Sequence, residues 1–312
     1  MQHYIGIDVG GTTIKYGLVD HAGQIQAQGA VPTPLNKNDF LEQLTKIVTD
    51  YQAQATDLAG IGISMPGIIK NNGFLVTAGA VRSMIGVNLK AEMEQRTNLP
   101  TNVENDANAA AIAEHWLGAA QGIENYLCLV LGTGFGGGAI INNQLYRGAH
   151  GMAGEFGWML THDLDFTRDL EDASLNKSSA IVGGLCHTYT LAKQQLDPEF
   201  ERVIDARVIF QAAAAGEKLA QMTLDKFYYD LATGILNLIV CYDPEVVLIG
   251  GGISANPTFI HDLNAALTDL ELRHVSVSEV KDQTIAQIKP AKLMNNAGII
   301  GAVYQAMQRQ EA

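Results

Sequence analysis

The sequence predicts an α/β protein of two related domains, each with a mixed sheet flanked by helices. Two glycine-rich segments predict this, because they stand at matching places in the two halves of the chain: residues 5–15 (IGIDVGGTTIK) and residues 129–138 (LVLGTGFGGG). Each begins with an apolar run of strand type, breaks into small residues and then resumes with apolar residues, which predicts a strand, a tight turn and a strand. The duplicated hairpin indicates two related domains that face one ligand.

In the first half, apolar periodicity predicts three antiparallel strands followed by alternating helices and strands. The predicted elements are strands at 4–9, 15–19 and 25–30, a helix at 40–54, a strand at 61–65, a helix at 89–96, a strand at 101–104 and an alanine-rich helix at 106–120. The strand at 61–65 ends at Pro66 and Gly67, which punctuate the chain as a turn.

The second half repeats this plan. We predict two strands within 126–141, helices at 210–220 and 223–242, a buried strand at 246–249 and helices at 258–270 and 297–307. We expect residues 1–118 and 297–312 to form an N-terminal domain. Residues 119–296 would then form a larger C-terminal domain.

The composition excludes several classes of protein. The 312 residues are 47% hydrophobic, enough for two domain-sized cores, and 33 acidic against 20 basic residues give a formal net charge of −13. Such a charge argues against a general surface for nucleic acid or anionic membrane. The three cysteines have no metal-type spacing, and the sequence has neither a signal-type start nor an apolar run that would span a bilayer. We therefore expect a cytoplasmic protein with reduced thiols and small-molecule partners.

The glycine-rich turns suit phosphate groups. Without a Cβ, the backbone N–H groups can converge on an anion while threonine hydroxyls add donors, and this applies to Gly10, Gly11, Thr12 and Thr13 and to Gly132, Thr133 and Gly134. Asp8 precedes the first turn and would repel phosphate directly, so we expect it to organise the water shell of a divalent cation carried by a nucleotide. Lys15 could neutralise phosphate charge or be structural, and we interpret it as structural because no GxxxxGK[ST] pattern places its ammonium group.

The chain resembles the ROK sugar kinases, whose fold belongs to the actin-like, ribonuclease H-like ATPase group. The resemblance covers nearly the whole chain and rests on six segments: residues 8–15, 66–67, 104–110, 132–138, 148–157 and 249–253. It implies that the two hairpins hold the phosphates of ATP, with Mg²⁺ carried by the nucleotide. It also implies that Gly251 and Gly252 lie near the nucleoside and that the sugar binds in the cleft between the domains.

By the same resemblance, Asp106 is the catalytic base and Asn105 binds sugar. Phosphoryl transfer needs a carboxylate that accepts the proton of the attacking hydroxyl, and an amide can fix neighbouring hydroxyls with its donor and its acceptor. Local sequence offers another interpretation of Asp106, since a carboxylate at the start of an alanine-rich helix caps free N–H groups. One residue could do both.

The resemblance implies further sugar contacts at Gly67, Glu155 and Glu171. Glu171 is equally well interpreted as a surface acid. Many members have a histidine three residues after the glutamate that matches Glu155, together with a zinc-binding cysteine cluster. This chain has Trp158 there and no cysteine between Glu155 and Cys186, so we do not expect zinc.

Trp158 and two histidines in this region each have more than one possible role. Trp158 could stack on sugar C–H groups or pack where the metal site would be, and packing is our preferred interpretation. His150 and His162 lack partners at metal spacing, and we interpret them as hydrogen-bonded loop histidines.

We therefore expect ATP-dependent phosphorylation of a hexose or an amino sugar, with glucose or N-acetylmannosamine as the leading substrates. A β-glucoside kinase or a fructokinase is the alternative within the family, and a non-catalytic sugar sensor is the alternative of another class. A nicotinamide-dependent oxidoreductase fits poorly, because the glycines at 132–137 continue into a strand and do not open a helix. A repressor of the same family would carry a DNA-binding region before the first hairpin, and Asp8 lies almost at the amino terminus. By analogy with the family, we expect a homodimer.

Overall fold

The computed structural model describes residues 2–55 and 57–311. The chain divides into two compact units, one comprising Met1–Ile123, Gly138–Gly154 and Lys292–Ala312 and the other comprising Glu124–Gly137 and Glu155–Ala291. The segment Gly138–Gly154 thus belongs with the first unit. The expected domain boundaries at residues 118 and 297 stay a prediction, and its end residues, 1 and 312, lie outside the described part of the chain.

The first unit is built on a five-stranded mixed sheet. Its strands are β1 (His3–Val9), β2 (Thr13–Asp20), β3 (Ile25–Pro32), β4 (Leu58–Met65) and β5 (Thr101–Asn105). They lie in the order β3-β2-β1-β4-β5, in which β1, β2 and β3 are antiparallel and β1, β4 and β5 are parallel. The carboxyl ends of β1, β4 and β5 therefore meet at one edge of the sheet, and this edge carries Asp8, Ser64 and Asn105.

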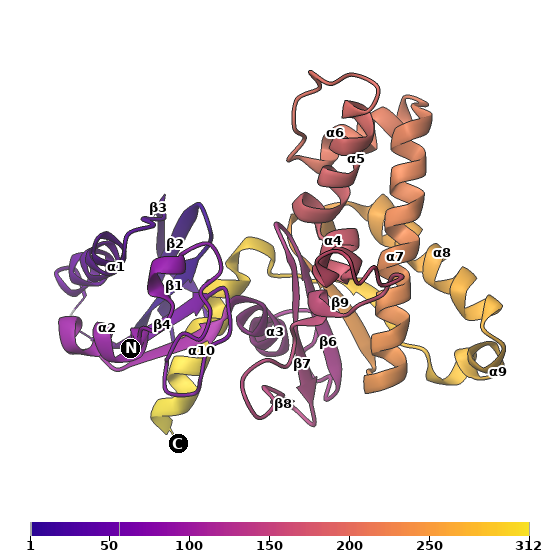
Figure 1. Cartoon of the computed structure of the whole chain (residues 1–312). Helices are drawn as coiled ribbons and strands as arrows, with labels where there is room; N and C mark the ends of the chain where they lie inside the picture. Colours follow the sequence, from indigo (N-terminus) through magenta and orange to yellow (C-terminus); the bar gives the residue numbers. More distant parts are fainter. Residues whose placement is uncertain (1, 56, 312) are drawn as a thin grey trace. The chain divides into compact units, whose positions relative to one another are not determined.

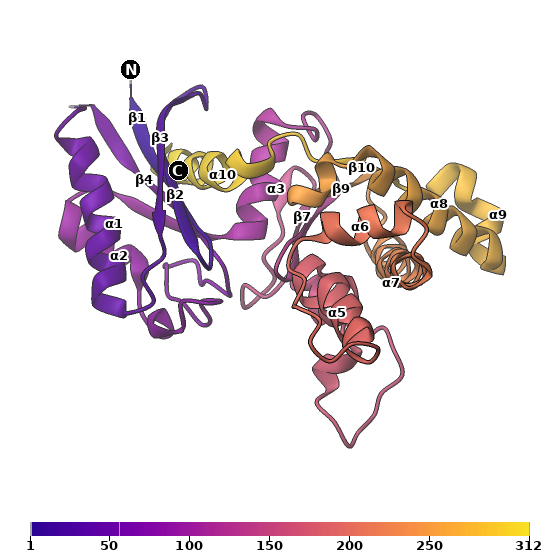
Figure 2. The same ribbon diagram turned by 90° about the horizontal axis from the view of Figure 1, so that it is seen from above.

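Helices cover both faces of this sheet, as Figures 1 and 2 show. The helices α1 (Lys37–Gln52) and α2 (Leu89–Thr97) cover one face, and α3 (Asp106–Leu117) and α10 (Ala297–Glu311) lie on the other. Phe40 and Leu44 of α1 pack with the strand residues Ile5 and Ile7 in the larger core. On the opposite face, Ile299 and Val303 of α10 pack with Tyr4 and Val19. Short 3₁₀ turns, η1 (Arg82–Met84) and η6 (Met294–Asn296), complete the unit.

The second sheet repeats the order of the first. Its strands are β6 (Tyr126–Leu131), β7 (Phe135–Ile141), β8 (Gln144–Leu145), β9 (Val246–Gly250) and β10 (Gln287–Pro290). Their order, β8-β7-β6-β9-β10, is the third-second-first-fourth-fifth order of the first sheet, and β6, β9 and β10 are again parallel. This confirms the predicted fold class of duplicated mixed sheets flanked by helices.

The helical part of the second unit centres on the long helix α7 (Lys218–Tyr242), whose apolar face packs with α8 (Pro257–Arg273) through Phe227 and Phe259. The other elements are short: η2 (Phe156–Trp158), η3 (Leu170–Ala173), α4 (Leu175–Ser179), the π-helical η4 (Ile181–Cys186), α5 (His187–Gln194), α6 (Ala206–Ala214), η5 (Gly252–Ala255) and α9 (Val275–Thr284).

The prediction of one helix over 210–220 was wrong. The structure ends α6 at Ala214 and starts α7 at Lys218, because Gly216 between them takes a φ of +90°, which a helix does not accommodate. The sequence analysis also missed α5, α9 and β10. Within α9, all of whose residues the structure describes, only Val277 is buried, so the apolar period that reveals a helix is nearly absent.

Candidate active site

The turn between β1 and β2 is tight and open to solvent. The Gly10 N–H donates to the Thr13 carbonyl oxygen at 3.0 Å, and Gly10, Gly11 and Thr12 are exposed. Thr33, which follows β3, braces the turn by donating its hydroxyl to the Gly10 carbonyl at 2.7 Å. The first predicted phosphate hairpin is therefore fixed by the Thr33 hydrogen bond, while its glycine segment stays exposed to solvent.

Asp8 lies at the end of β1 and is held by its neighbours on both sides. Its Oδ1 accepts a hydrogen bond of 2.9 Å from the hydroxyl of Ser64, which is fully buried at the end of β4. On the other side, Gly298 of α10 lies so close that a Cβ there would collide with the carboxylate. Burial raises the pKa of Asp8, while the Ser64 hydrogen bond and the charge of Lys15 oppose that rise. The site thus fixes a carboxylate beside the first turn.

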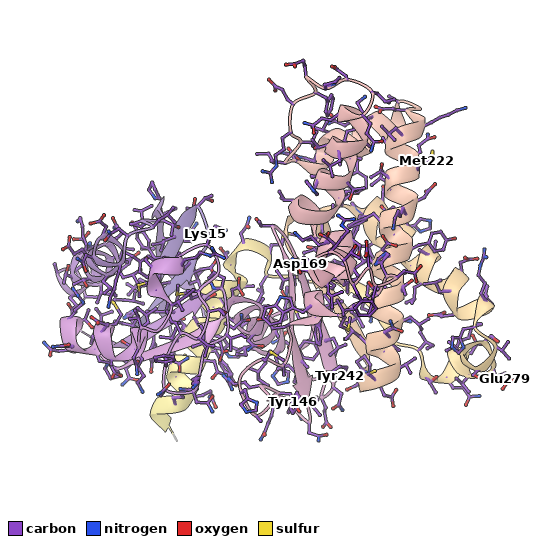
Figure 3. All side chains as sticks on the ribbon, viewed as in Figure 1. Lys15, Tyr146, Asp169, Met222, Tyr242 and Glu279 are labelled. Atoms are coloured by element: carbon purple, nitrogen blue, oxygen red, sulfur yellow. The ribbon has the colours of Figure 1, made fainter. Side chains whose placement is uncertain are left out.

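Lys15 is the cross-strand partner of Asp8 in the β1–β2 register, and Figure 3 labels it in the first unit. Its ammonium group donates to Oδ1 of Asn295 at 3.3 Å and lowers the pKa of Asp8 through its charge. Directly opposite residues share a face of the sheet, so the alternation of side chains sets Lys15 beside Asp8. This electrostatic contact was missed by the sequence analysis, although the antiparallel register of the predicted hairpin could have suggested it.

Asp106 is the first residue of α3, but it is not the cap of that helix. The N-cap is Asn105, whose Oδ1 accepts from the Asn108 N–H at 3.0 Å. Asp106 instead uses its Oδ1 to accept from the N–H of Ala107 at 2.9 Å, and its side chain stays exposed. Asn105, not Asp106, therefore caps α3, and the Asp106 carboxylate remains accessible.

The surrounding protein raises the pKa of Asp106 to about 6. The largest cause is desolvation, the second is the negative charge of Asp8, and hydrogen bonds from Ala107 and Asn105 oppose both. Asp106 is exposed to water, yet the protein around its carboxylate disfavours the charged form. Both conditions suit a group that must exchange a proton. Asp8 and Asp106, predicted from motifs nearly a hundred residues apart, are thus brought together.

Asn105 ties this turn to Gly67. Its Nδ2 donates to the Gly67 carbonyl at 3.0 Å while its Oδ1 caps α3, and its side chain also bonds to Asp106. A primary amide has two N–H donors and two acceptor lone pairs, so a lone pair of Oδ1 is left for a ligand. The two sugar-site candidates of the first unit, Gly67 and Asn105, are in contact, and their roles toward sugar stay predictions.

The second hairpin lies beside a cavity of about 920 Å³ in the second unit. Its turn closes when the Gly132 N–H donates to the Gly134 carbonyl at 2.9 Å, and Thr133 and Gly134 are exposed. Gly132, Thr133 and Gly252 line the cavity together. Gly251 stands behind it with a φ of +88°, where a Cβ would collide with the Leu131 carbonyl oxygen.

The apolar walls of this cavity were not predicted. Ile181 and Val182 of η4 come from one side and Phe210 of α6 from another, together with Ile253 of η5. The N–H groups of Ile181 and Val182 donate to the Gly132 carbonyl at 3.0 and 3.1 Å, which ties η4 to the hairpin. The sequence signal was weak, because Ile181, Val182 and Ile253 stand outside any long periodic segment.

Glu155, Trp158 and Glu171 lie in the second unit. Glu155 is half-buried, and its carbonyl accepts from the Trp158 N–H at 3.0 Å. Trp158 is 49% exposed, so packing accounts for only part of its ring surface. The bridge between Leu160 and Ser174 sets the Trp158 segment beside the segment of Glu171, whose side chain is exposed. Their contacts with sugar stay predictions.

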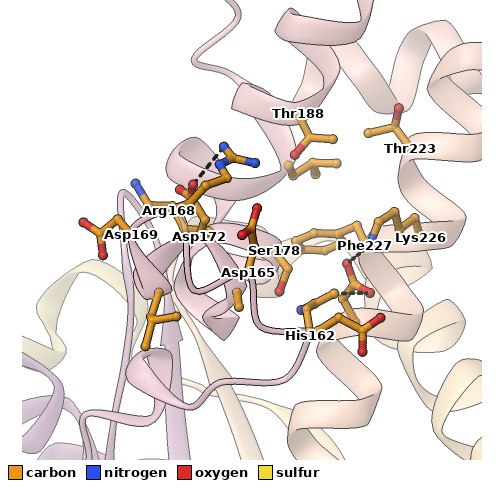
Figure 4. A pocket seen from close by; sticks show the side chains of 16 residues that line it. His162, Asp165, Arg168, Asp169, Asp172, Ser178, Thr188, Thr223, Lys226 and Phe227 are labelled. Atoms are coloured by element: carbon orange, nitrogen blue, oxygen red, sulfur yellow. Dashed lines mark hydrogen bonds and ion pairs between the residues drawn. The ribbon is translucent and has the colours of Figure 1, made fainter.

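A second cavity, of about 320 Å³, lies between the 160–177 loop and α7 (Figure 4). His162 of the loop lies 3.1 Å from Asp230 of α7, and Lys226 pairs with the same carboxylate at 2.6 Å. At the rim, Arg168 pairs with Asp172 at 2.9 Å. Among the described residues, no three His, Cys, Asp or Glu side chains are placed to hold a metal ion. The absence of zinc stays a prediction.

Comparison with known proteins identifies the family. The fold and its two turn-forming hairpins define an actin-like ATPase architecture, and the chain belongs to the ROK family, whose model matches residues 4–309. A β-glucoside kinase from Listeria innocua is 34% identical over 306 residues, which cover 97% of each chain. No helix within the described residues is both long enough and apolar enough to cross a membrane.

Solved structures agree with this family. Lmo2764 from Listeria monocytogenes, a proposed N-acetylmannosamine kinase, has a TM-score of 0.86 and 32% identity and covers 99% of this chain and 100% of its own. A ROK glucokinase from Streptomyces griseus, solved with glucose and AMPPNP, has a TM-score of 0.81 and 28% identity, with 98% and 99% coverage. The resemblance to sugar kinases inferred from the motifs is confirmed.

Proposed function

We propose that this protein transfers the γ-phosphoryl group of ATP to a hydroxyl of a hexose or an amino sugar, with Asp106 as the general base. The family and the kinases to which the chain is similar support the reaction class. The observation that carries the role of Asp106 is its exposed carboxylate at the start of α3, with a pKa raised to about 6 by desolvation and by the charge of Asp8.

A carboxylate with this pKa is a better base than an ordinary aspartate. It is mostly ionised at neutral pH, so it can accept a proton, and its affinity for that proton is higher than that of a free side chain. The sugar hydroxyl loses its proton to Asp106 as its oxygen bonds to the γ-phosphorus, and the bond from that phosphorus to the β-phosphate oxygen breaks, which leaves ADP. Asn105 holds the turn that carries the base by capping α3 and binding Gly67.

For the nucleotide, we propose the cavity beside the second hairpin. Its apolar walls at Ile181, Val182 and Phe210 suit a base and ribose, and the open amides of the turn from Gly132 to Gly134 suit phosphate oxygens. The first hairpin, from Gly10 to Thr13, supplies a second set of amides and hydroxyls.

The surroundings of Asp8 fit Mg²⁺ carried by the nucleotide. A carboxylate is a hard oxygen ligand that can hold the water shell of this ion, and Ser64 and Lys15 both favour its charged form. When bound, Mg²⁺ neutralises charge that develops on the phosphates. We do not propose any other metal for the reaction.

The sugar site is proposed around residues of both glutamate and amide type. The Glu155 carboxylate and the remaining lone pair of Asn105 Oδ1 supply acceptors for hydroxyls beside Gly67, and the exposed face of Trp158 can stack on sugar C–H groups. Glucose or N-acetylmannosamine is our leading candidate. A β-glucoside is the second candidate, supported by the 34% identity to the Listeria innocua enzyme. We also propose that the protein is cytoplasmic and a homodimer, and light scattering of the purified protein tests the dimer.

The first experiment measures ADP release with Mg·ATP against glucose, N-acetylmannosamine, fructose and cellobiose, with Asp106→Asn as the control for contaminating kinases. We expect turnover on at least one sugar, lost in the variant. Sugar binding without turnover across the panel would contradict the kinase and favour the sensor. Turnover on cellobiose above the monosaccharides would select the β-glucoside candidate.

A further inference from the structure

Glu104, the residue before Asn105, is only 3% exposed, and both oxygens of its carboxylate have partners. Its Oε1 accepts from the backbone N–H of Asn105 at 3.0 Å and from Nδ2 of Asn108 at 3.1 Å. Its Oε2 forms an ion pair with the Arg147 guanidinium. This carboxylate therefore holds both ends of the turn on which Asp106 stands.

Arg147 begins the loop that leads to Glu155. Its carbonyl oxygen accepts from the Ala153 N–H at 3.3 Å, so residues 147–153 close on themselves. Its side chain is 23% exposed, and its guanidinium also donates to Oε1 of Gln305 in α10 at 3.3 Å. The Arg147 side chain thus anchors the loop to the buried Glu104 of β5 and to Gln305 of α10.

The same loop contacts the segment that follows β4. Gly151 has a φ of +83°, and a Cβ there would lie 2.9 Å from the Ile69 carbonyl oxygen. Gly67, two residues earlier, receives the side-chain hydrogen bond of Asn105. Three segments of the first unit, at 67–69, 104–106 and 147–153, are therefore joined in a closed set of contacts, to which the Glu104–Arg147 pair contributes an ionic link.

The charges near this pair favour a fixed arrangement. Arg309 of α10 donates to the Asn71 carbonyl at 2.7 Å, and burial together with the charge of Arg147 lowers its pKa, while Glu104 opposes that effect. Two guanidinium groups thus share the neighbourhood of one buried carboxylate. Loss of Arg147 would break the ion pair of the buried Glu104 carboxylate, and a buried charge that loses its partner is costly.

We infer that Glu104 and Arg147 are positioning residues for the sugar site: they hold the Asn105–Asp106 turn in a fixed place relative to residues 148–154. This inference rests on the proposed sugar-kinase function. Neither residue needs to touch sugar or nucleotide. Their effect on the reaction follows from the distance and angle between the base and the attacking hydroxyl, to which phosphoryl transfer is very sensitive.

The test compares Arg147→Met with the double variant Glu104→Gln/Arg147→Met. Methionine keeps the apolar stem but removes the charge, and glutamine keeps an acceptor for the Asn105 N–H. For Arg147→Met we expect a fall in kcat of roughly 10- to 100-fold, an increased KM for sugar and an ATP KM within about twofold of wild type. The double variant removes both members of the pair, so neither charge is left without its partner, and its Tm should return toward wild type while kcat stays low.

Hydrogen exchange gives a measurement that does not depend on activity. We expect faster amide exchange confined to residues 104–108 and 147–154 in Arg147→Met. The matched control is Arg96→Met, which breaks the exposed pair with Glu92 on α2. It should change neither turnover nor the amide exchange of residues 104–108 and 147–154.

The outcomes separate the two proposals. If kcat recovers together with Tm in the double variant, the pair only stabilises the fold and the inference is wrong. Uniform or unchanged exchange in Arg147→Met also overturns it. If the wild-type protein releases no ADP with any sugar, the proposed function fails, and the exchange pattern still decides whether the pair holds these two segments.

Discussion

The negative charge of Asp8 at the end of β1 raises the pKa of Asp106 at the start of α3. This relationship joins the two chemical parts of the site, a carboxylate suited to the cation of a nucleotide and a carboxylate suited to accept a proton. It arises because β1 and β5 are parallel strands separated only by β4, so Asp8 near the end of β1 and Asp106 just after β5 meet at one edge of the sheet. It also makes the acidity of the proposed base depend on a second residue.

The pH dependence should report this coupling. A base acts only when ionised, so kcat/KM should fall as pH drops through the pKa of Asp106, which is about 6. In Asp8→Asn the neighbouring charge is gone, the pKa of Asp106 decreases, and the acid limb of the profile should move to lower pH. The measurement is kcat/KM against pH for both proteins. A limb that stays in place, or moves to higher pH, would contradict the coupling.

Because α10 packs against Asp8, we predict that replacing Gly298 of this helix by alanine lowers stability. Gly298 is the second residue of α10, where replacing Gly by Ala should stabilise by no more than the roughly 1 kcal/mol of a helix interior. In Gly298→Ala, however, the new methyl group collides with the Asp8 carboxylate, so we expect a lower Tm and at least a roughly tenfold loss of kcat/KM for ATP. Asp8→Ala in the same chain removes the collision and should return Tm, but not activity. A stabilised, fully active Gly298→Ala would show that Asp8 is free to move away.

The nucleotide cavity can be filled without disturbing the fold. Gly252 lines it and is exposed, and a Cβ added to this residue would have no other atom within 4 Å, so Gly252→Leu should leave Tm unchanged. The side chain would occupy space proposed for the nucleotide, and we expect the KM for ATP to rise at least about tenfold, equivalent to roughly 1.4 kcal/mol. The sugar KM should stay the same. Ala214→Leu adds the same side chain to α6 at an exposed position outside the cavity lining and should change neither KM.

The metal content is a separate prediction. With no cysteine between Glu155 and Cys186, the purified protein should contain far less than one zinc per chain by elemental analysis. A chelator removed before assay should leave Tm and Mg·ATP-dependent turnover unchanged, because no structural metal would have been lost. One zinc per chain that survives dialysis, or a Tm lowered by the chelator, would show that the expectation of no structural zinc is wrong.

The sequence predicted the features that are set locally. The hairpin at Gly10 and Gly11 and its copy at Gly132 and Gly134 were visible because turn glycines and flanking apolar runs lie within a dozen residues. The start of α3 was also visible. Which residue caps it was not, because Asn105 and Asp106 are both good caps, and only the reach of the Asn105 side chain to the Asn108 N–H decides between them.

Contacts that span the chain were not predictable from local pattern. The pairs Glu104–Arg147 and His162–Asp230 join residues 43 and 68 positions apart, and nothing in the spacing of charged residues identifies such partners. The apolar walls of the nucleotide cavity were missed for a related reason. Ile181 and Val182 stand in a π-helical turn whose period matches neither the helix nor the strand pattern.

The most direct test of the central claim is single-turnover phosphoryl transfer in Asp106→Asn, with sugar affinity measured on the same protein. The substitution keeps the shape of the side chain and removes its basicity. We expect the rate to fall at least roughly hundredfold while the Kd for sugar changes little. A rate equal to that of wild type, with sugar bound normally, would show that Asp106 is not the base.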